Sequence, residues 1–403
     1  MSEPASPPRA VPAAARRNAI PFWPLTATLL VQTVATMSLF SVPTAAPEIA
    51  QDLHVPGSLI GIFVSLVYGV GIISALLSPG FVHRYGAVRT SQASLLAVLG
   101  MLLTAAAGSL LSLALGAVVL GLAYGSLAPA STHLLVPRTP RRVFNLVMSV
   151  RQIGVPLGGV LGALIVPPLV GRIGWRATLL VELAPALLLL ALMELPRRAW
   201  DADRDPRRPL WGRTLLQPFR LLREDRRLRG LSVASFVFSG VQLCFIAFMT
   251  VQLTSVVRLD LVRAGFALAL YQVAGAASRP VWGWVADRYL SPSRMLAVLG
   301  FGMAAAALAI GRFGPGWPWA AVLGVAMFGG MTGSGFTGVA YAEYARIGGV
   351  RRTEATGLGT AAMFAGVMLM PSIFGAVVTA WGGWFLPYAG VAALAAGSAV
   401  LLL

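Results

Sequence analysis

The chain has 403 residues, of which 57% are hydrophobic and only 11% are charged. A soluble domain keeps about a quarter of its residues charged, so this composition excludes an ordinary soluble protein. The net charge of +17 invites a nucleic-acid interpretation, but the arginines lie between apolar runs long enough to be transmembrane helices. We therefore expect an all-α polytopic membrane protein that does not bind nucleic acid.

The apolar runs predict two six-helix bundles joined by a basic loop. Residues 1–21 are rich in proline, alanine and serine and lack the apolar core of a secretory signal, which predicts a disordered cytoplasmic tail. The first bundle covers 22–195, the central loop 196–229 and the second bundle 230–403. The twelve spans are expected near 22–44, 58–82, 90–108, 111–136, 143–170 and 175–195, and then near 231–256, 264–286, 294–311, 317–344, 354–380 and 381–403.

The central loop carries eleven arginines and a short apolar stripe. The stripe has helical spacing and consists of Leu215, Leu216, Phe219 and Leu222. It indicates either a helix that lies on the membrane surface against anionic lipid, or a solvated linker helix. The sequence leaves both possibilities open.

Arginine counts in the connections predict the orientation. Placing the N-terminus in the cytoplasm puts 24 arginines on the cytoplasmic side and five on the other, with two inside spans. Short cytoplasmic loops are the ones enriched in basic residues. We expect both termini and the central loop to be cytoplasmic, in a bacterial inner membrane.

Each half contains a related basic motif after its second span. In the second half the motif reads Gly283-Trp284-Val285-Ala286-Asp287-Arg288, with Arg294 downstream. In the first half it reads Pro79-Gly80-Phe81-Val82-His83-Arg84-Tyr85-Gly86-Ala87-Val88-Arg89. Both resemble the loop signature of the major facilitator superfamily, Gly-x-x-x-Asp-Arg-x-Gly-x-x-Arg, and the resemblance extends over essentially the whole chain. It implies twelve spans in two pseudo-repeats, with a substrate near the midplane between them.

The resemblance also implies a cytoplasmic latch. In this latch the aspartate pairs with arginine and with the positive N-terminal end of a neighbouring helix. The second copy keeps Gly283, Asp287 and Arg288, although Leu290 replaces its second glycine. The first copy keeps Arg84 and Gly86, but Pro79 and His83 replace its glycine and aspartate. His83 either makes this latch sensitive to pH or is a tolerated surface substitution.

Two arginines lie inside predicted spans, where a charge costs on the order of 3 kcal/mol. Arg279 precedes Asp287 by eight residues, or about 12 Å of helix. The segment Ser278-Arg279-Pro280-Val281-Trp282-Gly283-Trp284 is similar to span eight of oxalate/formate antiporters and monocarboxylate transporters, which implies a substrate carboxylate as the partner of Arg279. The superfamily fold implies that Arg151 of span five shares its cavity. A structural ion pair or helix-to-helix hydrogen bonds are the alternative.

An anion is the natural complement of this pair, because the sequence offers no acidic residue at mid-depth. Glutamates are expected only near span ends, at Glu48, Glu182, Glu194, Glu343 and Glu354. Further polar and aromatic candidates for the cavity are Gln32, Tyr68, Tyr124, Gln152, Gln242, Phe245, Tyr271, Gln272, Thr332, Phe336 and Thr360. The three tyrosines at 68, 124 and 271 are favoured because a buried phenol seeks a hydrogen-bond partner.

The sequence contains no nucleotide-binding loop, metal-ligand cluster or catalytic triad, so we expect neither an enzyme nor a cofactor. We expect a monomeric secondary active transporter of a small organic anion, a mono- or dicarboxylate, which works by alternating access with proton symport or anion exchange. The run Gly154–Gly159 loosely resembles a signature of drug/proton antiporters, which leaves an efflux pump for hydrophobic or cationic compounds as the alternative. Tight helix packing also explains this run. A sensor or scaffold that transports nothing is a second alternative.

Overall fold

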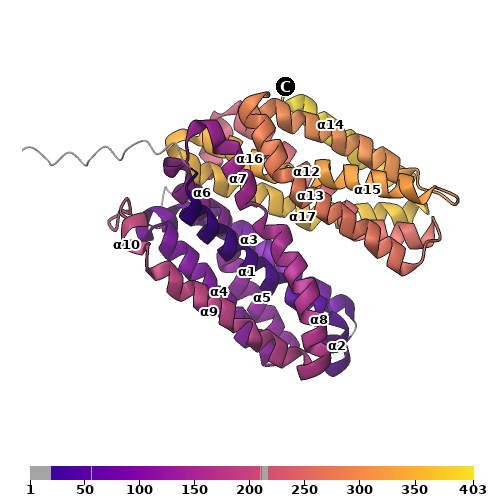
Figure 1. Ribbon diagram of the computed structural model, residues 1–403, viewed down its shortest axis with the longest axis horizontal. Coiled ribbons are helices and arrows are strands. Elements are labelled where there is room, and N and C mark those ends of the chain that lie inside the picture. Colours follow the sequence, from indigo (N-terminus) through magenta and orange to yellow (C-terminus); the bar gives the residue numbers. More distant parts are fainter. Residues whose placement is uncertain (1–19, 56, 209, 211–216) are drawn as a thin grey trace, which may run out of the picture.

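The structure is a computed structural model and describes residues 20–55, 57–208, 210 and 217–403 (Figure 1). Almost all of the expected N-terminal tail lies outside these residues, as do Leu215 and Leu216 of the central stripe. The described part of the chain is helical throughout, with short 3-10 turns and no strand. This confirms the all-α expectation.

The first half of the chain forms nine helices among the described residues. They are α1 (Phe22–Thr44), α2 (Ala46–Asp52), α3 (Gly57–Tyr85), α4 (Ala87–Ala106), α5 (Leu110–Tyr124), α6 (Leu127–Leu135), α7 (Phe144–Arg151), α8 (Gly154–Val181) and α9 (Leu183–Glu194). Local sequence explains several boundaries. Gly86 has φ of 98° between α3 and α4, and glycine adopts this conformation at no steric cost. Ser109 and Ser112 form a capping box that starts α5.

The central segment contributes the short helices α10 (Arg197–Trp200) and α11 (Gln217–Glu224). The second half then forms α12 (Arg226–Ser255), α13 (Leu261–Arg288), α14 (Pro292–Gly311), α15 (Trp319–Gly333), α16 (Thr337–Gly348), α17 (Arg352–Trp381) and α18 (Phe385–Leu401). Side-chain caps begin three of these helices. The carboxylates of Asp225 and Asp260 and the hydroxyl of Ser291 accept hydrogen bonds from the first-turn amides of α12, α13 and α14.

The helices account for the twelve expected spans. Eight helical runs of the described chain are long and apolar enough to cross a membrane, and two of them, Arg141–Glu194 and Trp319–Trp381, each hold two spans. α13 and the 17-residue α18 supply the remaining two. Four spans are broken rather than continuous: α5 and α6 form the fourth, α7 and the first part of α8 the fifth, the end of α8 and α9 the sixth, and α15 and α16 the tenth. Each break leaves backbone carbonyls outside the regular helix ladder.

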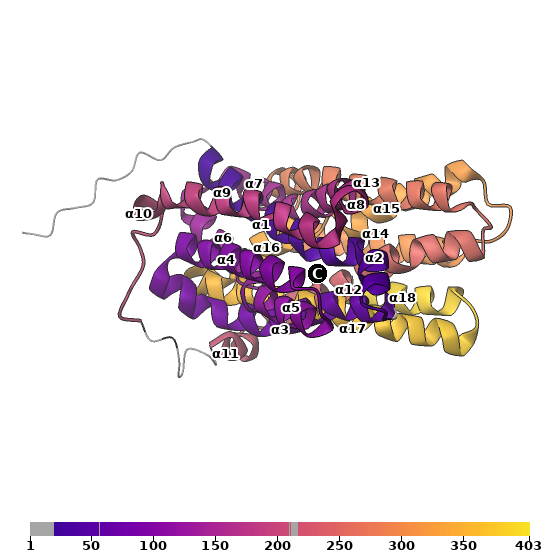
Figure 2. The ribbon, with the colours of Figure 1, turned by 90° about the horizontal axis from the view of Figure 1, so that it is seen from below.

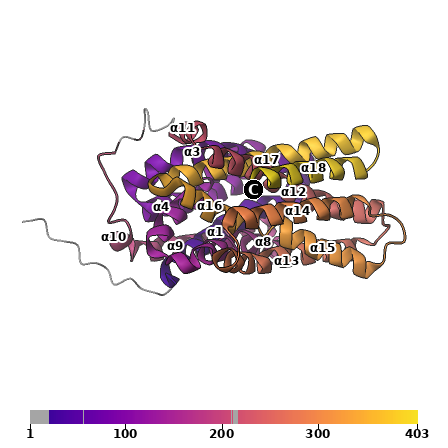
Figure 3. The ribbon, with the colours of Figure 1, turned by 90° about the horizontal axis from the view of Figure 1, so that it is seen from above.

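The buried apolar residues gather mainly in two clusters. One is built from α1, α3, α4, α5, α8 and α9, and the other chiefly from α12 to α18. In Figure 1 the corresponding ribbons approach each other at α6, α7 and α16 and diverge toward α2 and the end of α15. Figures 2 and 3 show α10 and α11 displaced toward the end opposite the turn between α17 and α18. The strongest contacts between the halves join α3 and α6 to α17, and α7 to α13 and α16.

Large apolar side chains are exposed along the outside of the helices. Trp23, Leu111, Leu164, Val262 and Trp381 have exposed fractions of 73%, 70%, 67%, 82% and 71%. Such a surface is unfavourable in water and matches the hydrocarbon of a bilayer. The exposed apolar side chains therefore fit an integral membrane protein.

Candidate functional site

A cavity of about 170 Å³ lies between the two halves of the chain. Eight helices contribute its polar and aromatic side chains, and residues at two helix breaks complete it. Its lining consists of Gln32, Phe40, Tyr68, Tyr124, Ala128, Arg151, Gln152, Val155, Pro156, Gly159, Ser239, Gln242, Leu243, Ile246, Gln272, Arg279, Ser334, Thr337, Tyr341, Thr360, Met363, Phe364 and Val367. The lining contains both intramembrane arginines and no carboxylate.

Arg151 is the last residue of α7, and its side chain is only 2% exposed. Its Nη2 donates hydrogen bonds to Oε1 of Gln32, at 2.9 Å, and to the carbonyl oxygen of Leu127, at 3.0 Å. Its Nη1 donates to the side-chain oxygen of Gln152. Within the described chain, its Nε is buried without a hydrogen-bond partner. All three acceptors are neutral, so protein dipoles stabilise the guanidinium without cancelling its charge.

Arg279 lies in α13 and is also 2% exposed. Its Nε donates to the carbonyl oxygen of Ser334, at 3.0 Å, and its Nη1 donates to the carbonyl oxygen of Gln152. Both carbonyls stand at helix breaks, because α15 ends at Gly333 and α7 ends at Arg151. Among the described residues its Nη2 has no hydrogen-bond partner. The broken spans therefore supply the acceptors that hold this arginine.

Aromatic side chains form one wall of the cavity. Phe364 of α17 stacks on Tyr124 at a centroid distance of 5.8 Å and an interplanar angle of 21°. The ring of Tyr68 meets Phe364 edge-on at 4.9 Å. The Tyr124 hydroxyl lies 3.0 Å from Oγ1 of Thr36 and accepts from Nε2 of Gln32 at 3.3 Å. Since Gln32 also contacts Arg151, the aromatic wall and the cationic centre belong to one hydrogen-bonded unit.

Nine of the ten predicted substrate contacts line this cavity. These nine are Arg279, Arg151, Tyr124, Tyr68, Gln32, Gln152, Gln242, Gln272 and Thr360. Tyr271 does not line it, because its fully buried ring packs inside the second half against Phe245, at 6.2 Å between centroids. Phe245, Phe336 and Thr332 are likewise absent from the lining. In this conformation these four side chains therefore lie outside the cavity lining.

The sequence reasoning missed several lining residues, above all Phe364, Tyr341 and Ser334. Tyr341 hydrogen-bonds Thr360 at 3.1 Å, and the Ser334 hydroxyl accepts from Gln242 at 2.9 Å. Ser334 lies in the glycine-rich break between α15 and α16, and this glycine-rich composition is the sequence feature that could have identified it as a lining residue. Phe364 carries no sequence signal that separates it from a lipid-facing phenylalanine.

Glu182 also departs from expectation. The residue joins α8 to α9, eight positions after the backbone turn at Gly174 and twelve before the end of α9. It is therefore not at the end of a span, and it is only 2% exposed. A carboxyl group does stand at depth in the first half, although it does not line the cavity.

The second-half signature contacts the first half directly. Oδ1 of Asp287 accepts from the backbone and side-chain amides of Asn145, at 2.9 and 2.8 Å, and Oδ2 accepts from the Leu146 amide at 2.9 Å. Because these amides start α7, the carboxylate meets the positive end of that helix. A Cβ on Gly283 would lie 2.7 Å from the Asn145 carbonyl oxygen, so only glycine permits this approach. Arg288 is exposed beside it.

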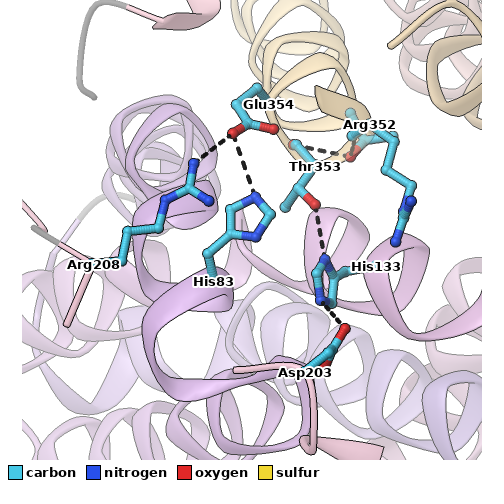
Figure 4. A network of polar contacts seen from close by, with 8 residues as sticks. His83, His133, Asp203, Arg208, Arg352, Thr353 and Glu354 are labelled. Carbon is cyan, nitrogen blue, oxygen red and sulfur yellow. Dashed lines mark hydrogen bonds and ion pairs between the residues drawn. The ribbon is translucent and has the colours of Figure 1, made fainter. Parts of the chain in front are cut away.

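The first-half signature makes a different set of contacts (Figure 4). Nε2 of His83 lies 3.4 Å from Oε1 of Glu354, which lies in the first turn of α17 and is 2% exposed. Arg208 of the central segment reaches the same carboxylate oxygen at 3.4 Å. Arg84 donates to the Arg208 carbonyl at 3.3 Å. The histidine that replaces the usual aspartate therefore faces an acidic partner on the other half.

His133 of α6 extends this network. Its Nδ1 lies 3.1 Å from the Thr353 hydroxyl and its Nε2 lies 2.9 Å from Oδ2 of Asp203. This hydrogen bond holds the pKa of Asp203 below its usual range. The rings of His83 and His133 meet edge-on with centroids 5.1 Å apart. Sequence reasoning did not find His133, because its partners lie 70 and 220 positions away.

Asp201, also in the central segment, binds the first turn of α4. Its carboxylate accepts from the amides of Val88 at 2.8 Å and Arg89 at 3.1 Å. Burial raises the pKa of Asp201, because the charged form loses hydration there. A Cβ on Gly86 would lie 2.2 Å from the Asp201 carboxyl carbon. The central segment is thus packed onto the first half, next to the signature.

Comparison with known proteins agrees with this architecture. The family model described as Major Facilitator Superfamily matches residues 28–345 and 258–403. The 4-hydroxybenzoate transporter PcaK of Acinetobacter baylyi is 27% identical over 298 residues, which make up 66% of this chain and 64% of PcaK. The matched region is thus slightly less than two thirds of that relative.

Solved structures show the same fold. A structure of the E. coli fucose:proton symporter FucP superposes with a TM-score of 0.74 at 14% identity, over 95% of this chain and 97% of FucP. The human organic anion transporter MFSD10 gives 0.74 at 16% identity, over 94% and 98%. The family match covers well over half of the sequence, and the solved folds agree over 94% or more of it, so this chain belongs to the Major Facilitator Superfamily.

Proposed function

We propose that this transporter moves a small organic anion, a mono- or dicarboxylate, and that Arg151 and Arg279 hold its carboxylate. One observation carries the proposal: two buried guanidiniums from opposite halves line one cavity whose described lining contains no carboxylate. Planar guanidinium groups pair with carboxylates through two parallel hydrogen bonds. The carbonyl and amide oxygens around the two arginines stabilise their positive charge but do not neutralise it. A bound anion would neutralise it.

The aromatic wall supports a substrate with a planar ring. Phe364, Tyr68 and Tyr124 line the same cavity as the two arginines, and an aromatic pair contributes about 0.5 to 1.5 kcal/mol. The similarity to a 4-hydroxybenzoate transporter points to the same class of compound. We therefore favour an aromatic monocarboxylate among the organic anions.

Alternating access follows from two halves that contact each other mainly at one end. The arginine-rich connections lie at that end, which we assign to the cytoplasm together with both termini. The contacts of Asp287, His83 and Glu354 then close the cytoplasmic side in this conformation, and the bundles at 22–195 and 230–403 rock about the cavity. We place the protein in a bacterial inner membrane as a monomer, with the basic segment at 196–229 near anionic lipid. The transported anion is accompanied by protons or exchanged for another anion.

An efflux pump for cationic compounds receives less support. A cation in this site would face two buried guanidiniums without a compensating carboxylate in the described lining. The glycine run that suggested this alternative serves helix packing. A Cβ on Gly158 would lie 2.4 Å from the Thr33 carbonyl oxygen, and one on Gly154 would lie 2.7 Å from that of Leu29.

The direct test is binding and counterflow with the purified, reconstituted protein. A thermal-shift screen against aromatic and aliphatic carboxylates should find a ligand that raises the melting temperature, since a ligand that binds the folded state stabilises it. Arg279→Ala should abolish that shift, and Arg279→Lys should weaken it. Arg172→Ala, at an exposed arginine of α8, is the matched control. Unchanged affinity for every transported compound in both Arg279 variants would overturn the proposal.

A further inference from the structure

The carboxyl group of Glu182 is held entirely by neutral groups. Ser38 Oγ donates to its Oε2 at 3.1 Å, and Ser41 Oγ lies 2.5 Å from its Oε1. Both serines belong to α1, so the carboxyl lies between α1 and the junction of α8 with α9. No ion pair to Glu182 occurs within the described chain. An ionised carboxylate that is 2% exposed and lacks a cation is unfavourable.

The charged groups on the surrounding helices are occupied elsewhere. α1 contains no charged residue, and the only one on α4 is Arg89, which pairs with Glu194 at the far end of α9 at 3.2 Å. On α8, Arg176 precedes Glu182 by about 9 Å of helix and pairs with Asp52 of α2 at 2.8 Å. The other charges on these helices, Arg172 of α8 and Glu48 of α2, are exposed. A proton is therefore the available counter-charge for Glu182.

The hydrogen-bond geometry accommodates both protonation states. An ionised Glu182 accepts a hydrogen bond from each serine. When Glu182 is protonated, its O–H donates to Oγ of Ser41, and the single proton of that hydroxyl turns to the Met37 carbonyl oxygen, which lies 2.9 Å away. Gain or loss of a proton thus needs only the rotation of one hydroxyl, with no buried group left unpaired.

α1 links this carboxyl to the anion cavity. Gln32 and Thr36 of α1 contact Arg151 and Tyr124, and Ser38 and Ser41 follow on the next turns of the same helix. Ser38 lies six residues beyond Gln32, or about 9 Å. A change in charge at Glu182 therefore acts on the helix that positions the acceptor of Arg151.

We propose that Glu182 binds the proton that accompanies the transported anion. The inference rests on the proposed anion transport and assigns its coupling site. The step is a simple proton equilibrium, in which the carboxylate and a proton form the neutral acid on one side of the membrane and separate on the other. The anion and the proton then bind at separate places, one at the two arginines and one at Glu182.

The test combines transport with infrared spectroscopy. In proteoliposomes, Glu182→Gln should retain carboxylate counterflow but lose accumulation driven by a pH gradient, while Glu182→Asp should retain both. Glu48→Gln, at the exposed glutamate of α2, is the matched control and should behave as wild type. Gradient-driven accumulation by Glu182→Gln at the wild-type level would overturn the proposal.

The infrared measurement does not depend on transport. Titration between about pH 5 and pH 9 should reveal a protonated carboxyl band that is absent from Glu182→Gln. If no such band titrates in the wild-type protein, Glu182 does not exchange a proton and the assignment is wrong. Loss of carboxylate binding by the wild type would instead refute the anion proposal and leave this titration intact.

Discussion

The carbonyl oxygen of Gln152 accepts a hydrogen bond from the guanidinium of Arg279, although the two residues lie 127 positions apart in the chain. The side chain of the same glutamine accepts from Arg151. One residue at a helix break therefore holds a cation from each half of the transporter. A movement of one half against the other must change the hydrogen bond between Arg279 and Gln152. The same contact therefore belongs to the anion site and to the interface that moves during transport.

Removing either arginine should weaken binding, and removing both should cost less than the sum. Arg151→Ala and Arg279→Ala are each expected to lower carboxylate affinity by tenfold to a hundredfold, or about 1.4 to 2.8 kcal/mol. Groups that bind the same ligand couple in a double-mutant cycle. Calorimetric titration of the two single variants and the double variant measures the coupling. Strictly additive losses would show that the arginines act at separate places.

The ring of Phe364 should select aromatic over aliphatic carboxylates. Phe364→Leu keeps an apolar side chain but removes the stack on Tyr124 and the edge contact with Tyr68. We expect benzoate affinity to fall by about two- to tenfold, with little change for propionate. Met363→Leu, at a neighbouring lining residue, provides the control. An equal loss for both ligands would assign Phe364 to packing alone.

Asp287 should hold the cytoplasmic ends of the two halves together. Asp260, which caps its own helix α13, should not have this effect. Asp287→Ala removes hydrogen bonds that cross from α13 to the start of α7, each worth about 1.5 to 3 kcal/mol when one partner is charged. Amide hydrogen exchange in α7 should become faster. Asp260→Ala removes a cap within α13 itself and should leave α7 unaffected. Slow exchange of α7 in both variants would contradict a latch at Asp287.

Restoring the family's aspartate at position 83 should destabilise this protein. His83→Asp would place a carboxylate beside Glu354, which is almost fully buried. Like charges at that distance repel, so we expect a lower melting temperature. Adding Glu354→Gln should recover much of the loss. If His83→Asp has the same melting temperature as the wild type, the contact between residues 83 and 354 does not contribute to stability.

The sequence predicted the fold well, because the bilayer imposes long apolar helices that hydropathy detects directly. It did not predict the breaks between α5 and α6, α7 and α8, or α15 and α16, because apolar character continues across each of them. Those breaks matter for the site. The carbonyls of Gln152 and Ser334 that bind Arg279 are available only because two helices end there.

The two buried arginines were predictable because a charge within an apolar run is conspicuous in the sequence. The rotation of each helix about its own axis, which decides which side chains face the cavity, was not predictable. Tyr271 and Gln272 are neighbours on α13, yet Gln272 shares a face with Arg279 one heptad later while Tyr271 turns into the second half. The contacts of His83, His133 and Asp201 could not be predicted either, because their partners are remote in sequence. Glu182 was assigned to a span end although the expected sixth span, 175–195, begins directly after the turn at Gly174; the error concerned its depth in the span and not the position of the turn.

The segment that carries Asp201, Asp203 and Arg208 is also the covalent connection between the two bundles. Pairing of Asp203 with His133 and of Arg208 with Glu354 is therefore an intramolecular event with a high effective concentration. After every excursion to the opposite conformation, the groups that close this end remain tethered within reach of their partners. Cutting the chain between Arg208 and the second bundle would make the pairing of Arg208 with Glu354 depend on two separate fragments meeting in the bilayer, and the transporter would reset more slowly.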